Sequence, residues 1–145
     1  MNEALAREWF NADVSKISDA ILALRGWKLY AREFPVLDIG FQTAGRRELR
    51  IRFLAPNWNE TPPSVQLLNA DGQFAAGADL PKGAGSLFNP NNHTATSRPF
   101  VCMAGSLEYH TWHSHVADVW ENYKHKPAYT LGGIMTQLWD AWLKG

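Results

Sequence analysis

A change in the period of the hydrophobic residues constrains the fold of this chain more than any other sequence feature. Over residues 3–25, apolar side chains recur every three or four positions, which predicts an amphipathic helix that ends at Gly26. Asn11 and Asp13 interrupt this pattern, so we expect a break in the helix near them. From residue 27 onward the period becomes that of strands. The chain is therefore predicted to begin with a helix and to continue into a sheet.

Four strand-like runs follow this helix. They cover residues 27–34, 36–43, 48–55 and 64–68 and are separated by turn-forming residues. In the third run apolar and charged residues alternate, which predicts one buried face and one solvated face. The loop before the fourth run ends in Pro62-Pro63, and adjacent prolines are excluded from a central strand because each lacks a backbone donor. We therefore expect a rigid entry to an edge or a turn at that point.

The second half of the chain has a different character. Residues 73–99 show little periodicity and many Gly, Pro, Asn, Ser and Thr residues, which predicts a long irregular stretch. A short apolar run at 98–103 follows, and a C-terminal helix is predicted with Thr130 as its N-cap and an apolar stripe from Leu131 to Trp142. This order favours an α+β fold in one domain, residues 1–145, with helices on one side of an antiparallel sheet.

The charge balance argues against two classes of partner. Fourteen Lys and Arg residues are offset by fourteen Asp and Glu residues, giving a formal net charge of +0. Broad contact with nucleic acid or an anionic membrane depends on an excess of basic residues, so we expect neither partner. No apolar run approaches the roughly 20 residues of a transmembrane helix. With one cysteine and no basic-then-apolar leader, the sequence predicts a reducing, cytoplasmic setting.

The single cysteine, Cys102, has two interpretations. It lies where the apolar run Phe100-Val101-Cys102-Met103 meets Ala104-Gly105 and a polar segment. A cysteine within a strand is usually an inert small hydrophobe. A cysteine at the start of a loop near imidazoles instead has the exposure and the neighbours that a nucleophile requires. The residue pattern alone leaves both readings open.

Three of the five histidines follow Cys102 closely. His113 and His115 would share one face of a strand, and His110 could join them in a turn, so a metal site can be drawn. The segment lacks the carboxylate or second cysteine that would make such a site specific. The same imidazoles near a reactive thiol could supply a general base. Asp118 and Glu121 are interpreted as carboxylates that compensate the dipole of a short helix.

The chain contains, in order, a loop that ends in Pro62-Pro63, the tripeptide Asn89-Pro90-Asn91, Cys102 and Trp120. This order resembles that of the ubiquitin-conjugating enzyme family over most of the chain. The loop that ends in Pro62-Pro63 is similar to the family's loop into its fourth strand, and Asn89-Pro90-Asn91 is similar to its His-Pro-Asn motif. Cys102 then takes the place of the catalytic cysteine, and Trp120 and the helix start at 129–131 follow. The long interval from Cys102 to Trp120 resembles the divergent bacterial branch, which includes stand-alone proteins of antiphage operons.

The resemblance implies both a fold and an activity. The fold would be a four-stranded antiparallel meander with an N-terminal helix and C-terminal helices. Cys102 would carry the C-terminal glycine of a protein partner as a thioester and pass it to an amine. Asn91, His110, His113 or His115 would stabilise the oxyanion or act as the base. The partner implied is a cGAS-like nucleotidyltransferase or, in a second bacterial branch, a ubiquitin-like protein, with no cofactor and no metal.

Two other functions compete with this one. The same fold could serve as a protein-binding module without catalysis, with Cys102 structural and with Trp58 and Trp112 as exposed anchors for a partner. The three histidines could alternatively belong to a metal-dependent hydrolase. Cys102 at the family's position favours the conjugating enzyme over the binding module, and metal analysis of the purified protein would decide the third possibility.

Overall fold

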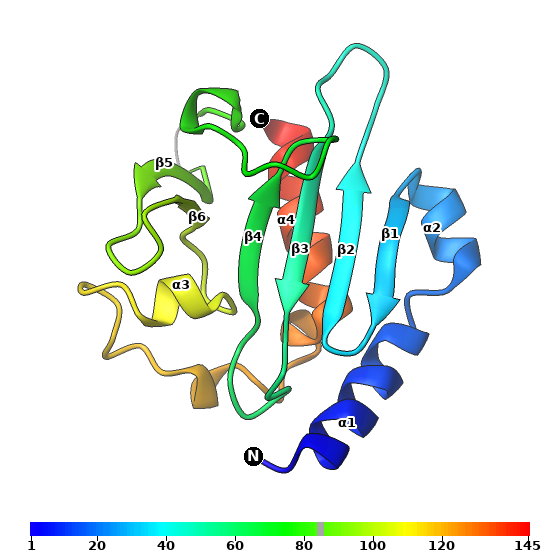
Figure 1. Cartoon of the computed structure of the whole chain (residues 1–145), viewed down its shortest axis with the longest axis vertical. Helices are drawn as coiled ribbons and strands as arrows, with labels where there is room; N and C mark the ends of the chain where they lie inside the picture. Colours follow the sequence, from blue (N-terminus) through cyan, green and yellow to red (C-terminus); the bar gives the residue numbers. More distant parts are fainter. Residues whose placement is uncertain (84–85) are drawn as a thin grey trace.

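The computed structural model describes residues 1–83 and 86–145 and contains an N-terminal pair of helices, a four-stranded sheet, a small second sheet and a C-terminal helix (Figure 1). The helices and strands are α1 (Glu3–Ser15), α2 (Asp19–Arg25), β1 (Lys28–Glu33), β2 (Val36–Phe41), β3 (Leu49–Leu54), β4 (Ser64–Leu68), β5 (Phe88–Asn92), β6 (Pro99–Val101), α3 (Leu107–His110) and α4 (Leu131–Lys144). Three short 3₁₀ turns, η1 (Gly77–Asp79), η2 (Trp120–Asn122) and η3 (Pro127–Tyr129), complete them.

The N-terminal helix breaks later than the sequence predicts. α1 continues through Asn11 and Asp13, and the break falls where Ser18 caps α2 by accepting a hydrogen bond from Ile21 N. The Asp13 side chain accepts a hydrogen bond from Leu131 N at 3.1 Å and so caps α4 across the structure. Asp13 thus interrupts the apolar pattern of α1 because it caps the N-terminus of α4. Gly26, at φ 66°, ends α2 as predicted.

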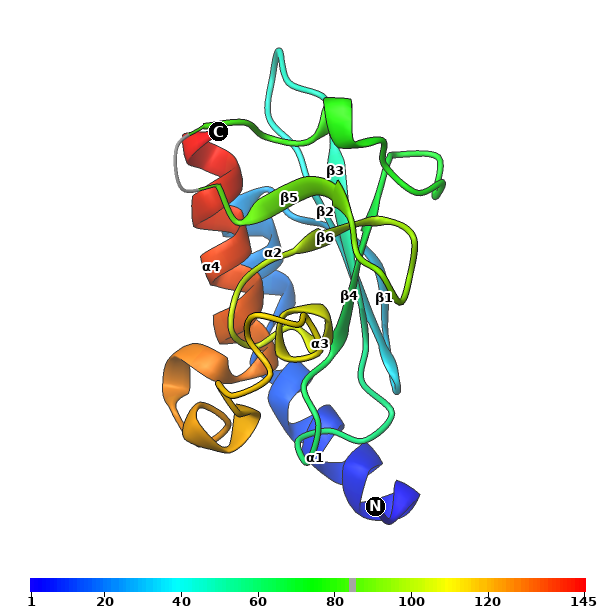
Figure 2. The ribbon, with the colours of Figure 1, turned by 90° about the vertical axis from the view of Figure 1, so that its left-hand side faces the viewer.

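The four strands form an antiparallel meander in the order β1-β2-β3-β4, as predicted. In β3 the alternation is clear, because Leu49, Ile51 and Phe53 are buried whereas the arginines between them are partly exposed. Figure 2 shows α4 and α2 on one side of this sheet, with α1 running from that side to below the lower end of the sheet. The protein is therefore an α+β structure with its C-terminal helix packed on one face of an antiparallel sheet.

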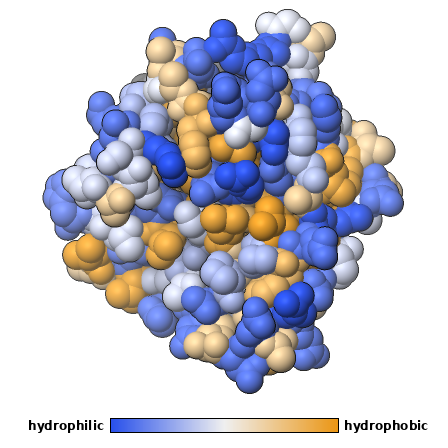
Figure 3. Space-filling view, in the orientation of Figure 1, coloured by the Kyte–Doolittle hydropathy of each residue, from blue (hydrophilic) through white to orange (hydrophobic). Residues whose placement is uncertain are grey.

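The opposite face of the sheet is polar and internally paired. Arg50 donates to both carboxylate oxygens of Asp38, at 2.6 and 3.2 Å, and Arg52 donates to Gln66. Figure 3, which views the molecule from this side, shows hydrophilic and apolar residues intermixed. The charged residues of β3 lie on the face opposite the core as predicted, but this face is only partly solvated, because the Arg50 side chain is 13% exposed.

The stretch at 73–99 is more ordered than predicted. β5 pairs with β6 in a second, two-stranded antiparallel sheet. The sequence Phe-Asn-Pro-Asn-Asn of β5 is rich in turn formers, which is why its pattern suggests a loop. Pro90 is tolerated because the pairing is irregular between Asn89 and Asn92. The prediction of an irregular stretch is therefore wrong over residues 88–92. The apolar run at 98–103 contains the strand β6.

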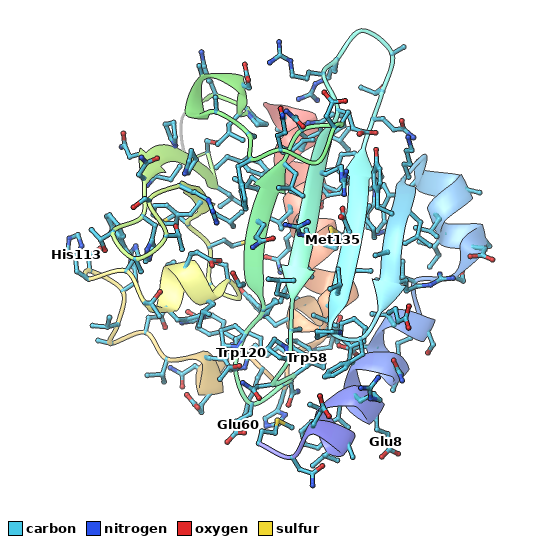
Figure 4. The ribbon with its side chains drawn as sticks, in the orientation of Figure 1. Glu8, Trp58, Glu60, His113, Trp120 and Met135 are labelled. Atoms are coloured by element: carbon cyan, nitrogen blue, oxygen red, sulfur yellow. The ribbon has the colours of Figure 1, made fainter. Side chains whose placement is uncertain are left out.

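The C-terminal helix covers the buried face of the sheet. Thr130 caps it by accepting a hydrogen bond from Gly133 N at 3.0 Å, as predicted. Its apolar stripe is buried, and Met135 lies behind the sheet in the view of Figure 4. Among the described residues, no helix has both the length and the apolar character needed to cross a membrane.

Candidate active site

Cys102 lies directly after β6, at the edge of the small sheet. Its backbone N–H donates to Leu87 O at 2.8 Å, which holds Cys102 beside the residue that directly precedes β5. The side chain is half-buried, and this burial raises the pKa of the Cys102 thiol above its ordinary value. The thiol is therefore protonated at neutral pH and needs a base if it is to act as a nucleophile.

The turn after Cys102 requires a glycine. Gly105 has a φ of 101°, and a Cβ there would lie 3.2 Å from Tyr129 Cδ1 and 3.3 Å from Ile134 Cδ1. Ser106 closes the turn, because its hydroxyl donates to Val101 O at 2.8 Å and accepts from Tyr109 N as the N-cap of α3. The turn thus directs the chain from the cysteine into α3 and the histidine segment.

His115 is the predicted histidine that reaches the thiol. Its Nε2 lies 3.6 Å from Cys102 Sγ, a distance that fits an S–H···N hydrogen bond to an unprotonated Nε2. The His115 ring stacks on Tyr109, with ring centroids 4.3 Å apart and planes inclined by 15°. The sequence expectation that a histidine of this segment lies beside Cys102 is therefore met by His115.

His110 has both ring nitrogens occupied by the backbone. Its Nδ1 lies 2.7 Å from Asp118 O, a carbonyl that can only accept, so Nδ1 carries the proton. Its Nε2 accepts a hydrogen bond from Gly105 N at 3.1 Å and is therefore unprotonated. His110 is neutral in this arrangement and ties the cysteine turn to Asp118. Because both ring nitrogens are already hydrogen-bonded, His110 is better placed to hold the backbone together than to accept a proton from the thiol.

His113 lies apart from the other two histidines. It is exposed, contacts the Trp112 ring and points outward at the edge of the molecule (Figure 4). Residues 111–118 form turns, so His113 and His115 do not share a strand face as the sequence predicts. Within residues 1–83 and 86–145, no group of three or more His, Cys, Asp or Glu residues is arranged to hold a metal ion. The three-histidine metal site drawn from the sequence is not formed.

Asn91 lies well along β5 from the thiol. Cys102 is hydrogen-bonded to Leu87, four residues before Asn91, and a strand advances by about 3.3 Å per residue. Asn91 is exposed, and its backbone N–H donates to Asn89 Oδ1 in a local turn. The structure therefore does not bring Asn91 and Cys102 together.

The prediction that Trp58 is exposed is wrong. Trp58 is only 2% exposed and packs against Trp120, with ring centroids 5.9 Å apart below the sheet (Figure 4). Trp120 Nε1 donates to Asn59 O at 2.8 Å and fixes this pair. Burying two large rings against each other stabilises the loop more than exposing one to solvent would, so Trp58 is a core residue.

Trp112 is half-buried and belongs to an aromatic cluster. Its ring lies 5.1 Å from that of Phe100 and 5.3 Å from that of His93. His93 is buried, and its Nε2 lies 3.0 Å from Glu108 O. Most of the Trp112 ring therefore faces the protein, and only part of it is available to a partner.

Sequence reasoning missed the roles of three residues around the thiol–imidazole pair. Tyr109 and Tyr123 each donate a hydrogen bond to the same oxygen of Asp118, Oδ2, at 2.6 Å. These bonds hold the pKa of Asp118 below its usual value, while they raise the pKa of Tyr109 and bring that of Tyr123 to about 12. Asp118 lies in a bend and not in a helix, so its interpretation as a dipole-compensating carboxylate is wrong. The density of aromatic and histidine residues from 109 to 115 was the available signal.

Comparison of the chain with protein-family models and with curated proteins gives no match.

Proposed function

We propose that the protein is a ubiquitin-conjugating-enzyme-like acyl carrier. It would hold the C-terminal carbonyl of a protein partner as a thioester on Cys102 and transfer it to an acceptor amine. The observation that carries this proposal is the 3.6 Å contact between Cys102 Sγ and His115 Nε2. The order of the elements along the chain also supports it, because an N-terminal helix, a four-stranded meander and a C-terminal helix follow one another as the resemblance implies.

The loading step follows from this pair. The donor arrives with its C-terminal glycine activated as a thioester on another protein. The Cys102 thiol gives its proton to His115, and Sγ bonds to the glycine carbonyl carbon. The bond from that carbon to the donor's sulfur then breaks, and the leaving thiolate takes the proton from His115. The raised pKa of the thiol is the reason that a neighbouring base matters here.

The transfer step uses the same two side chains. The nitrogen of the acceptor amine bonds to the carbonyl carbon, and the bond between that carbon and Sγ breaks. His115 takes a proton from the amine and returns it to the Cys102 thiolate, which restores the starting state. Much of the rate would come from holding amine and thioester in contact.

The identity of the donor follows only from the resemblance. The bacterial branch that the chain resembles implies a cGAS-like nucleotidyltransferase with a C-terminal glycine, and a ubiquitin-like protein in its second form. Either donor would present a C-terminal glycine, so both fit the same chemistry at Cys102.

The test is the intact mass of the protein from its native host under mildly acidic, non-reducing conditions. We expect a polypeptide adduct that neutral hydroxylamine removes from the wild type. Cys102→Ala should carry none, and Cys102→Ser should hold any adduct as an oxyester that resists brief hydroxylamine treatment. The adduct mass identifies the donor. The proposal fails if the wild type carries no labile adduct or if the adduct persists in Cys102→Ala.

One observation favours a second candidate, a protein-binding module without catalysis. Burial raises the pKa of the Cys102 thiol, as it does for structural cysteines. A thiol that iodoacetamide modifies at pH 7 much more slowly than free cysteine, in a chain without an adduct, would support this candidate over the acyl carrier.

A further inference from the structure

We propose that Asp118 and Tyr109 are positioning residues for the Cys102–His115 pair. Asp118 holds the Tyr109 phenol, and the Tyr109 ring holds the His115 imidazole with Nε2 toward the thiol. The inference deepens the proposed function and rests on the same site. Its test reads the reactivity of the thiol and needs no acyl donor, so it can succeed or fail separately from thioester transfer.

The first link of the chain of contacts is the carboxylate. Asp118 Oδ2 accepts hydrogen bonds from Tyr109 and Tyr123, and both distances are 2.6 Å. Charge-assisted bonds of this length are stronger than those between neutral groups. The Tyr109 backbone is fixed as well, because its N–H donates to Ser106 Oγ at 3.1 Å. The phenol ring is therefore held at its backbone and at its hydroxyl.

The second link is the stacking of two rings. The Tyr109 and His115 planes differ by only 15°, and their centroids are 4.3 Å apart. Turn hydrogen bonds hold the His115 backbone, from its N–H to Trp112 O at 2.9 Å and from Asp118 N to its carbonyl at 3.0 Å, but they do not set the plane of its ring. The stacking on Tyr109 orients the ring, and in that orientation Nε2 lies 3.6 Å from Cys102 Sγ.

The backbone ties Asp118 to the cysteine turn. His110 bonds to Asp118 O through Nδ1 and to Gly105 N through Nε2, at 2.7 and 3.1 Å. These bonds tie the Asp118 backbone to the turn, and the hydrogen bonds from Tyr109 and Tyr123 hold its carboxylate. Three groups face His115. The Cys102 thiol and the Tyr109 ring contact it, and the charged carboxylate of Asp118 lies farther away. That negative charge favours the imidazolium that forms when His115 takes the thiol proton.

Two tyrosines provide a matched pair of variants for the test. Tyr109→Phe and Tyr123→Phe each remove one hydrogen bond from the same oxygen of Asp118, but only the Tyr109 ring stacks on His115. The measurement is the rate of Cys102 alkylation by iodoacetamide from about pH 5 to pH 8, the interval in which imidazoles titrate. The thermal midpoint of each variant controls for a general loss of structure.

We expect Tyr109→Phe to slow alkylation at pH 7 by at least about threefold, because a small misplacement of a reacting group has a large effect on rate. It should also flatten the rise in rate between about pH 5 and pH 8. Tyr123→Phe should keep both the rate and the pH profile of the wild type. Asp118→Asn keeps an acceptor oxygen but removes the charge, so it should slow alkylation as Tyr109→Phe does.

Equal effects of the two tyrosine variants on rate and on thermal midpoint would overturn the proposal, because they would indicate a purely structural network. An unchanged pH profile in Tyr109→Phe and Asp118→Asn would overturn it too. If the variants behave as expected but the native protein carries no thioester, the proposed function fails and the positioning network stands.

Discussion

At the scale of single residues, His113 and His115 show that a histidine near Cys102 in the sequence need not contact it in the structure. They are the same residue type two positions apart, yet only His115 lies beside the thiol. We expect His115→Ala to lower the rate of Cys102 alkylation at pH 7 by about tenfold or more, because general bases contribute at least this much. His113→Ala is the matched control and should keep the wild-type rate. Equal losses in the two variants would show that His115 does not act on the thiol.

Asp118 should also leave a signature in the pH dependence of stability. Its pKa is lowered in the folded state by the hydrogen bonds from Tyr109 and Tyr123. A carboxyl group of this kind stabilises the fold above its unfolded pKa of about 3.9, and this contribution disappears as the pH falls through the lower folded value. We expect Asp118→Asn to lower the thermal midpoint at pH 7 and the difference from wild type to shrink below about pH 4. A difference that is constant down to pH 2 would contradict this.

At the scale of elements, Glu108 joins α3 to the edge of the main sheet. Its side chain, in a residue only 5% exposed, accepts hydrogen bonds from Val65 N at 2.8 Å and from Ser64 Oγ at 2.6 Å. Because Glu108 is followed directly by Tyr109 and His110, this attachment also places the candidate site against β4. The carboxylate thus links the meander to the segment that carries the thiol's neighbours.

We expect Glu108→Ala to lower the free energy of unfolding by about 2 kcal/mol, because it leaves the buried Val65 N–H without an acceptor. Glu108→Gln retains a carbonyl oxygen for that N–H and should have a smaller effect. Urea unfolding of the three proteins measures both values. If the two variants lose the same stability, the hydrogen bond to Val65 is not the source of the effect.

The elements that could be predicted from the sequence are those with a repeating pattern. The alternation at 48–55 and the stripe from Leu131 to Trp142 gave β3 and α4 because each pattern reflects one buried face. β5 was not predicted, because its asparagines and Pro90 are more typical of turns than of strands. The hydrogen bond by which Asp13 caps α4 at Leu131 was not predicted, because it joins residues 118 positions apart in the sequence.

The candidate site was predictable only in part, for a related reason. A lone cysteine followed by a cluster of histidines marks the neighbourhood, and composition is enough to see it. Which histidine reaches Cys102 depends on the turns at 111–118, and turns carry no period. The same holds for Asp118, whose two phenol partners lie nine residues before it and five residues after it.

At the scale of the whole molecule, the buried apolar side chains form a shared core. The cluster includes Phe10 of α1, Ile51 of β3, Val101 of β6, Trp120 of η2 and Leu138 of α4. That the chain is a single domain is a prediction from its sequence, and a shared core is what such a domain requires.

We therefore expect one cooperative transition in urea, with the same midpoint by tryptophan fluorescence and by far-ultraviolet circular dichroism. Cys102 accessibility to a thiol reagent should rise at that midpoint as well, because β6 belongs to the same core. Exposure of the thiol at a clearly lower urea concentration would show that the small sheet unfolds on its own.

Gly105 has an evolutionary consequence. Drift at most buried positions can be compensated, since a larger side chain is accommodated when a neighbour becomes smaller. Here smaller residues at positions 129 and 134 would make room for a Cβ, but they would leave the backbone at φ 101°, which other residues rarely adopt. No single compensating substitution restores both space and conformation. Among descendants of this chain, we expect the glycine three residues after the cysteine to persist for as long as this turn does, whatever becomes of the thiol.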